Sequence, residues 1–213
     1  MTAFTQFKMG LAMCCLIVAA GCAQKDVSIP AVNDAGVVVS GIAVLPVRTA
    51  VDVDMADGSS LAEEKMLQDG SQVMNGLLQQ VLAGKPGIRF VAATPAGKKE
   101  GTVNDLEAAR RVATQQGCNT VLETTLSRYN ERVGGDYGVK QPAAVTFAYK
   151  LYEVREGRVL CHGRFDERQQ SVMENLLTLP KAKSRGLIWL TAEELARDGL
   201  QEKLGQCSYL GGQ

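Results

Sequence analysis

One histidine limits the nucleophilic chemistry that this sequence could support. His162 is the only histidine in the chain, so any Ser–His or Cys–His mechanism would have to use it. It follows Cys161 directly in a segment that alternates like a β-strand, where adjacent side chains point to opposite faces. A thiolate–imidazolium pair would need a bulge there, and we expect an exposed or hydrogen-bonded histidine instead. No second pair at ligand spacing accompanies these two residues, so we expect no metal and no cofactor.

Three carboxylates near this histidine could in principle act as a general acid and base. Asp166, Glu167 and Glu174 are close enough in sequence to form the pair that a glycosidase needs. Carboxylates at the edge of a sheet are usually solvated, however, and a single tryptophan, Trp189, cannot form an aromatic groove for a sugar. We therefore predict a protein that is not an enzyme, with a hydrolase as the least favoured alternative.

Nucleotide and nucleic-acid binding are also disfavoured. Gly84-Lys85 is followed by Pro86 where a phosphate-binding loop needs Ser or Thr, and no dinucleotide fingerprint is present. The chain has 23 basic and 23 acidic residues, so it lacks the basic excess of a nucleic-acid binder. We expect neither nucleotides nor nucleic acids as partners.

The first 22 residues carry the most specific pattern in the sequence. Residues 10–20 are apolar but too short to span a bilayer, and they end in Ala19-Ala20-Gly21-Cys22. This pattern resembles the export signal of bacterial lipoproteins, although that family more often has Leu at the position of Ala19. The resemblance implies cleavage before Cys22 and acylation of this residue, which gives stable anchoring. Ala23 implies the outer membrane, facing the periplasm; the alternative is an ordinary secretory signal with Cys22 as a plain thiol.

The remaining cysteines predict one disulfide and one buried thiol. Removal of the signal leaves Cys118, Cys161 and Cys207 in an oxidising compartment. The sequence leaves the pairing open. Cys161 with Cys207 is favoured, because a helix that returns along its preceding strand brings these positions together.

Hydrophobic periodicity predicts an α/β (α+β) domain over residues 37–213, after a tether over residues 22–36. The expected strands are 37–47, 88–91, 120–132, 143–154 and 158–169, and the expected helices are 60–84, 104–116, 171–179 and 192–204. Leaving aside the short helix 171–179, the order β-α-β-α-β-β-β-α predicts a mixed sheet with helices packed on it and an antiparallel meander near the C-terminus. Thr191 and Glu194 form a capping box for the last helix.

One segment stands out as a candidate contact surface. It begins on the last strand and continues into the short helix 171–179, whose apolar residues recur at helical spacing. These side chains could close the core beneath the last helix, or they could contact a partner or a second copy of the chain. The candidate interface residues are Phe165, Val172, Met173, Leu176, Leu177 and Trp189.

Four short motifs give the mature chain a family resemblance: VLPV at 44–47, GCNTVLE at 117–123, VTFAYKLYEV at 145–154 and GRFDERQQ at 163–170. With the order of elements, they resemble the periplasmic domain shared by the curli secretion channel lipoprotein, the Pel polysaccharide lipoprotein and the lipoprotein activators of penicillin-binding proteins. The chain lacks the additional amphipathic hairpins of the curli channel. The resemblance implies a non-enzymatic protein that assembles with itself or with an envelope protein, in polysaccharide or protein export. The alternative is a regulator of a cell-wall synthase, which a tether of about 14 residues, roughly 50 Å long, would reach less easily.

Overall fold

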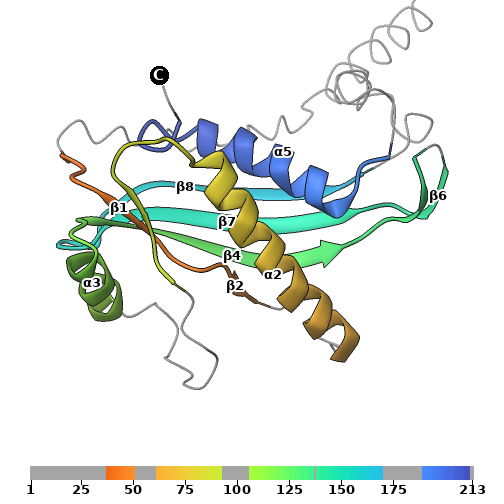
Figure 1. The fold of residues 1–213 in the computed structure, drawn as a ribbon, viewed down its shortest axis with the longest axis horizontal. Helices are drawn as coiled ribbons and strands as arrows, with labels where there is room; N and C mark the ends of the chain where they lie inside the picture. The colour runs from red at the N-terminus through yellow and green to blue at the C-terminus, as the bar shows by residue number, and fades with distance from the viewer. Residues whose placement is uncertain (1–36, 51–60, 93–105, 137, 170–188, 212–213) are drawn as a thin grey trace, which may run out of the picture. The chain divides into compact units, whose positions relative to one another are not determined.

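The computed structural model describes residues 37–50, 61–92, 106–136, 138–169 and 189–211 (Figure 1). The elements are β1 (Ile42–Val44), β2 (Arg48–Thr49), α2 (Leu61–Val81), β3 (Ile88–Phe90), α3 (Leu106–Gln115), β4 (Thr120–Asn130), β5 (Val133–Gly135), β6 (Gly138–Gln141), β7 (Ala144–Glu153), β8 (Val159–Arg168) and α5 (Ala192–Gly205). The tether, Cys22 and the predicted helix 171–179 lie outside the described residues.

A mixed sheet organises the fold. Its strand order is β3-β1-β4-β7-β8, with β1 parallel to both β3 and β4 and with β4, β7 and β8 forming an antiparallel meander. β2 also runs parallel to β4, beyond the end of β1. The fold class predicted from the sequence is confirmed.

The predicted strand 37–47 is shorter and interrupted in the structure. Val44 pairs with Leu122 and Arg48 pairs with Thr125, so β1 and β2 use one residue more than β4 over this interval. Pro46 lies within the interruption, and a proline cannot donate a ladder hydrogen bond. Between β4 and β7, the strands β5 and β6 pair as a short antiparallel ribbon.

Helices cover both faces of the sheet, but unequally. α2 and α5 lie over one face, in front of β4, β7 and β8 in Figure 1, and the main apolar core fills the space between them. Its fully buried side chains include Met74, Leu122, Leu126, Phe147 and Leu195. On the opposite face, α3 packs a smaller core against the β1 side of the sheet, with Ala109 and Ala113 facing Ala43, Val121 and Tyr152.

Local signals fix the ends of two helices. The Thr191 side chain accepts a hydrogen bond from the Glu194 N–H, and the Glu194 carboxylate accepts one from the Thr191 N–H, so the predicted capping box is present. Gly117 follows α3 with a φ of 63°, the left-handed conformation that glycine adopts without a Cβ penalty.

Candidate functional site

The start of α5 lies at a junction that holds the two ends of the segment 170–188. Leu190 N–H donates to the Gln169 side chain at 2.7 Å, which joins the residue after β8 to the residue before the cap of α5. Trp189 N–H donates to the Asp136 carbonyl at 2.9 Å, and the Arg132 guanidinium donates to the Trp189 carbonyl at 2.6 Å. The end of β8 and the start of α5 therefore lie next to each other.

A carboxylate strengthens this junction. Both oxygens of Glu131 accept hydrogen bonds from Ala192 N–H, at 3.1 and 3.2 Å, at the first residue of α5. A negative charge at the N-terminus of a helix is stabilising, because the N–H groups there lack intrahelical partners. Arg132 also pairs with Asp136 at 2.5 Å. The ribbon β5–β6 and the start of α5 are thus connected by charged and polar contacts.

The predicted interface residues divide into three groups. Val172, Met173, Leu176 and Leu177 lie outside the described residues. Trp189 is half-buried and belongs to the junction. Phe165 is a correction: it lies in the core at 3% exposure, stacked on Phe147 with ring centroids 5.3 Å apart, so its side chain does not face a partner. Its position on β8 between the sheet and α5 explains this burial.

The cysteines lie at the opposite end of α5. Cys161 and Cys207 form a disulfide with a Cα–Cα distance of 5.9 Å, which is the pair that the sequence favours. This bond joins β8 to the residues that follow α5. Cys118 is a free, buried thiol. Burial raises its pKa, and the charge of Arg89 lowers it only partly, so the thiol is poorly suited to act as a nucleophile.

The residues considered for catalysis do not converge. His162 is exposed, and its register partner on β7 is Lys150. Partial burial raises the pKa of Asp166, but hydrogen bonds from Thr146 and Arg164 and the nearby Arg128 outweigh it and hold the pKa below its ordinary value. Such a carboxyl stays ionised and cannot serve as a general acid. Glu174 lies outside the described residues.

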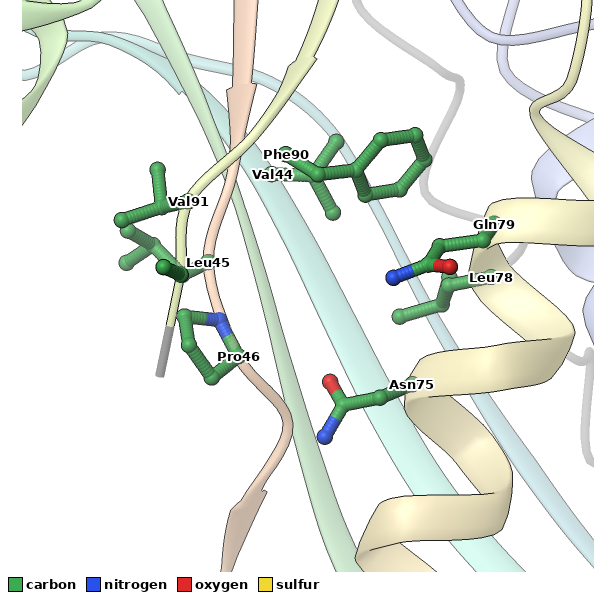
Figure 2. A pocket seen from close by; sticks show the side chains of 9 residues that line it. Val44, Leu45, Pro46, Asn75, Leu78, Gln79, Phe90 and Val91 are labelled. Atoms are coloured by element: carbon green, nitrogen blue, oxygen red, sulfur yellow. The ribbon is translucent and has the colours of Figure 1, made fainter. Parts of the chain in front are cut away.

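A groove between β3, the β1–β2 connection and the middle of α2 was not anticipated from the sequence (Figure 2). Its volume is about 350 Å³. It is lined by Val44, Leu45, Pro46, Asn75, Leu78, Gln79, Phe90, Val91 and Ala92. The Asn75 side-chain oxygen accepts a hydrogen bond from Val47 N–H at 2.9 Å, so this side chain links α2 to the β1–β2 connection. None of these lining residues is ionisable, and the groove therefore offers no acid–base chemistry.

A second feature that the sequence did not indicate lies on the α3 side of the sheet. Arg48 and Glu123 form an ion pair beside Tyr152. The Tyr152 hydroxyl is buried and has no hydrogen-bond partner among the described residues. Burial raises the pKa of Tyr152 to about 12, with Glu123 adding to the rise and Arg48 opposing it. The alternation of charged residues in 120–168 was the one signal in the sequence that could have indicated a polar sheet face here.

The described residues contain neither a metal-binding cluster nor a membrane-spanning helix. No group of three or more His, Cys, Asp or Glu side chains there is arranged to hold a metal ion. No helix within the same residues combines the length and the apolar character needed to cross a bilayer. The described part of the chain is thus a mixed α/β fold with a polar junction, a neutral groove and a charged sheet face.

No family model and no curated protein matches this sequence. Solved structures similar to the chain include the PelC dodecamer from Paraburkholderia phytofirmans, with 14% identity and a TM-score of 0.45 over 81% of this chain and 89% of that one. The LpoB C-terminal domain from Escherichia coli has 18% identity and a TM-score of 0.37 over 63% of this chain and 87% of that one. Lipoprotein GNA1162 from Neisseria meningitidis has 18% identity and a TM-score of 0.32 over 68% and 96%. The group that the sequence resembles is thus found among these structures, at low identity, and the similarities assign no function to this chain.

Proposed function

We propose that this chain is a non-enzymatic periplasmic lipoprotein that acts as an assembly or scaffold component of an envelope complex. Cys22 would carry the lipid anchor and hold the protein at the outer membrane, facing the periplasm. The complex would serve polysaccharide or protein export. The export signal and the family resemblance of the sequence support this proposal, as do the raised pKa of the Cys118 thiol and the lowered pKa of the Asp166 carboxyl.

The junction at the start of α5 is the observation that carries the proposed contact. Gln169 and Leu190 are hydrogen-bonded to each other, so the segment 170–188 is held at both of its ends. A chain whose two ends are fixed close together has less conformational freedom to lose on binding than a free tail has. We place the partner contact on the apolar residues of this segment, which are Val172, Met173, Leu176 and Leu177.

Site-specific crosslinking in intact cells tests this contact. A photoreactive amino acid at Met173 should give a discrete crosslinked band, either with a second copy or with an envelope protein. The same amino acid at Gln201, which is exposed on α5, is the matched control. Equal crosslinking from both positions, or none from Met173, would overturn the placement. A cell-wall synthase as the crosslinked partner would instead support the alternative role as a synthase regulator.

The oligomeric state separates self-assembly from docking on another protein. Light scattering after size exclusion should show a discrete oligomer if the segment 170–188 joins copies of the chain. Met173→Glu should then lower the measured mass to that of a monomer, because a charge cannot be buried without a partner. Gln201→Glu should leave the mass unchanged. A wild-type chain that stays monomeric would mean that the partner is another envelope protein and not a second copy of this chain.

The anchor has its own test, independent of the contact. The intact mass of the protein purified from membranes should correspond to a chain that begins at Cys22 and carries acyl groups. A chain of unmodified mass that begins near this residue would show an ordinary secretory signal. The hydrolase alternative would require Asp166→Asn to abolish a measurable turnover in a folded protein.

A further inference from the structure

The face of the sheet away from α2 and α5 gathers charged residues that lie far apart in sequence. Phe147, Tyr149 and Leu151 point into the main core, so the alternate residues of β7 point to the other face. Lys150 is one of them, and it is flanked in register by Glu123 on β4 and His162 on β8. Arg128 follows a register shift on β4 and pairs with Thr146, and Arg164 on β8 pairs with Ala148, so both also lie on this face.

Basic residues dominate this surface, which we call the charged sheet face. Carboxylates occupy two of its described strand positions, Glu123 and Asp166. Its basic residues outnumber them three to one, and they come from all parts of the sheet. They are Arg48, Arg89, Arg128, Lys150, Arg164 and Arg168.

The two carboxylates are already occupied by neighbours on the same face. Glu123 pairs with Arg48. Asp166 contacts Arg164 at 3.1 Å and Arg128 at 3.4 Å. Lys150 and Arg168 are exposed and have no ion pair among the described residues. Among the described residues, Lys150 and Arg168 therefore present positive charge toward solvent on this face.

The opposite side of the molecule has the reverse balance. α2 and α5 together carry seven carboxylates and three basic residues. The chain is neutral as a whole, with equal numbers of acidic and basic residues. Among the described residues, the charged sheet face thus carries an excess of positive charge, and α2 and α5 carry an excess of negative charge.

We propose that the charged sheet face docks on the anionic phospholipid headgroups of a membrane surface. The basic residues are spread over β2, β3, β4, β7 and β8 instead of converging on one point, which suits a broad anionic surface better than a single small anion. Basic residues near such a surface attract it additively, within a distance set by ionic screening. The acidic helices would then face away from the membrane.

Chemical footprinting of the full-length protein on vesicles tests this orientation. The probes are phosphatidylcholine vesicles with and without phosphatidylglycerol. Acylation of Lys150 and carbethoxylation of His162 should slow about fivefold when phosphatidylglycerol is present, and high salt should restore both rates. Lys65, which is exposed on α2, is the internal control and should react equally on both vesicles. Unchanged labelling of Lys150 and His162 would overturn the proposal.

A pair of variants separates charge from fold. The double substitution Lys150→Glu with Arg168→Glu should abolish the protection of His162, whereas Lys65→Glu should leave it intact. All of these positions are exposed, so circular dichroism should show an unchanged fold. Protection that appears without vesicles and grows with protein concentration would mean that the face contacts the acidic helices of a second copy. That result would also overturn the membrane assignment. The test does not depend on whether Cys22 is acylated, so its failure would leave the proposed function standing.

Discussion

The two faces of the sheet differ in the residues that β4, β7 and β8 place on them. On the face under α2 and α5, alternate residues of β7 are apolar and buried, as Phe147 and Leu151 illustrate. On the other face, β7 presents Ala144, Thr146, Ala148 and the exposed Lys150 before it reaches Tyr152 in the α3 core. The first face holds the larger apolar core, and the second combines the smaller α3 core with exposed charged residues. A strand that alternates in this way encodes a core and a surface at once.

Truncation on each face should give the largest contrast. Phe147→Ala removes a fully buried ring that stacks on Phe165, and we expect a loss of about 4 kcal/mol in the free energy of unfolding. Lys150→Ala, three residues along the same strand but on the charged sheet face, should change it by less than about 0.5 kcal/mol. Urea denaturation measures both values. A comparable loss for the two variants would refute the division of roles between the faces.

The disulfide should contribute next, because it ties α5 to the face that the helix covers. The bond closes a loop with a sequence separation of 46 residues, and replacing both Cys161 and Cys207 by Ser should cost about 3 kcal/mol. Thermal melting with and without a reductant measures the effect. Reductant should bring the wild-type protein down to the level of the variant. The melting temperature of Cys118→Ala, which keeps the disulfide, should also fall when reductant is added. A melting temperature that reductant does not change would show that the disulfide does not stabilise the fold.

Two glycines of α2 allow a comparison between a position that contacts the sheet and one that does not. A Cβ at Gly70 would lie 2.4 Å from Cγ of Tyr129, so Gly70→Ala should push α2 away from β4 and cost about 2 kcal/mol. A Cβ at Gly76 would meet no atom within 4 Å, so Gly76→Ala should stabilise the helix by up to about 1 kcal/mol. Opposite signs for these matched substitutions would establish close packing at Gly70. A stabilising Gly70→Ala would show that the contact is loose.

Local patterns in the sequence predicted the elements, whereas surfaces that depend on register escaped prediction. The alternation in 143–154 and the capping box at Thr191 are visible in a single stretch of sequence, and both correspond to observed structure. The charged sheet face requires knowing that Lys150 lies beside Glu123 and His162, which only the pairing of β4, β7 and β8 reveals. The burial of Phe165 was missed for a related reason. Its neighbours in sequence are polar, but its neighbours in space are Phe147 and Gly199.

The smallest predicted effect concerns the polar edge of the α3 core. The Tyr152 hydroxyl is buried, and no hydrogen-bond partner for it lies in the part of the chain that the structure describes. Tyr152→Phe should therefore be neutral or stabilising by up to about 1 kcal/mol at pH 7. The pKa of Tyr152 is about 12 in the folded chain, above the value near 10 expected after unfolding. Stability from this group is therefore present below pH 10 and is lost as the pH rises through 12.

The pH dependence is what distinguishes this prediction from a simple packing effect. Between pH 10 and 12 the phenylalanine variant should lose less stability than the wild-type protein, because it has one fewer group to ionise on unfolding. Thr125→Ala, on the same face and without a titratable group, should follow the wild-type pH profile. Denaturant unfolding at neutral and alkaline pH measures all three proteins. If Tyr152→Phe has the same alkaline profile as wild type, then this tyrosine titrates normally and the Arg48–Glu123–Tyr152 cluster is open to water.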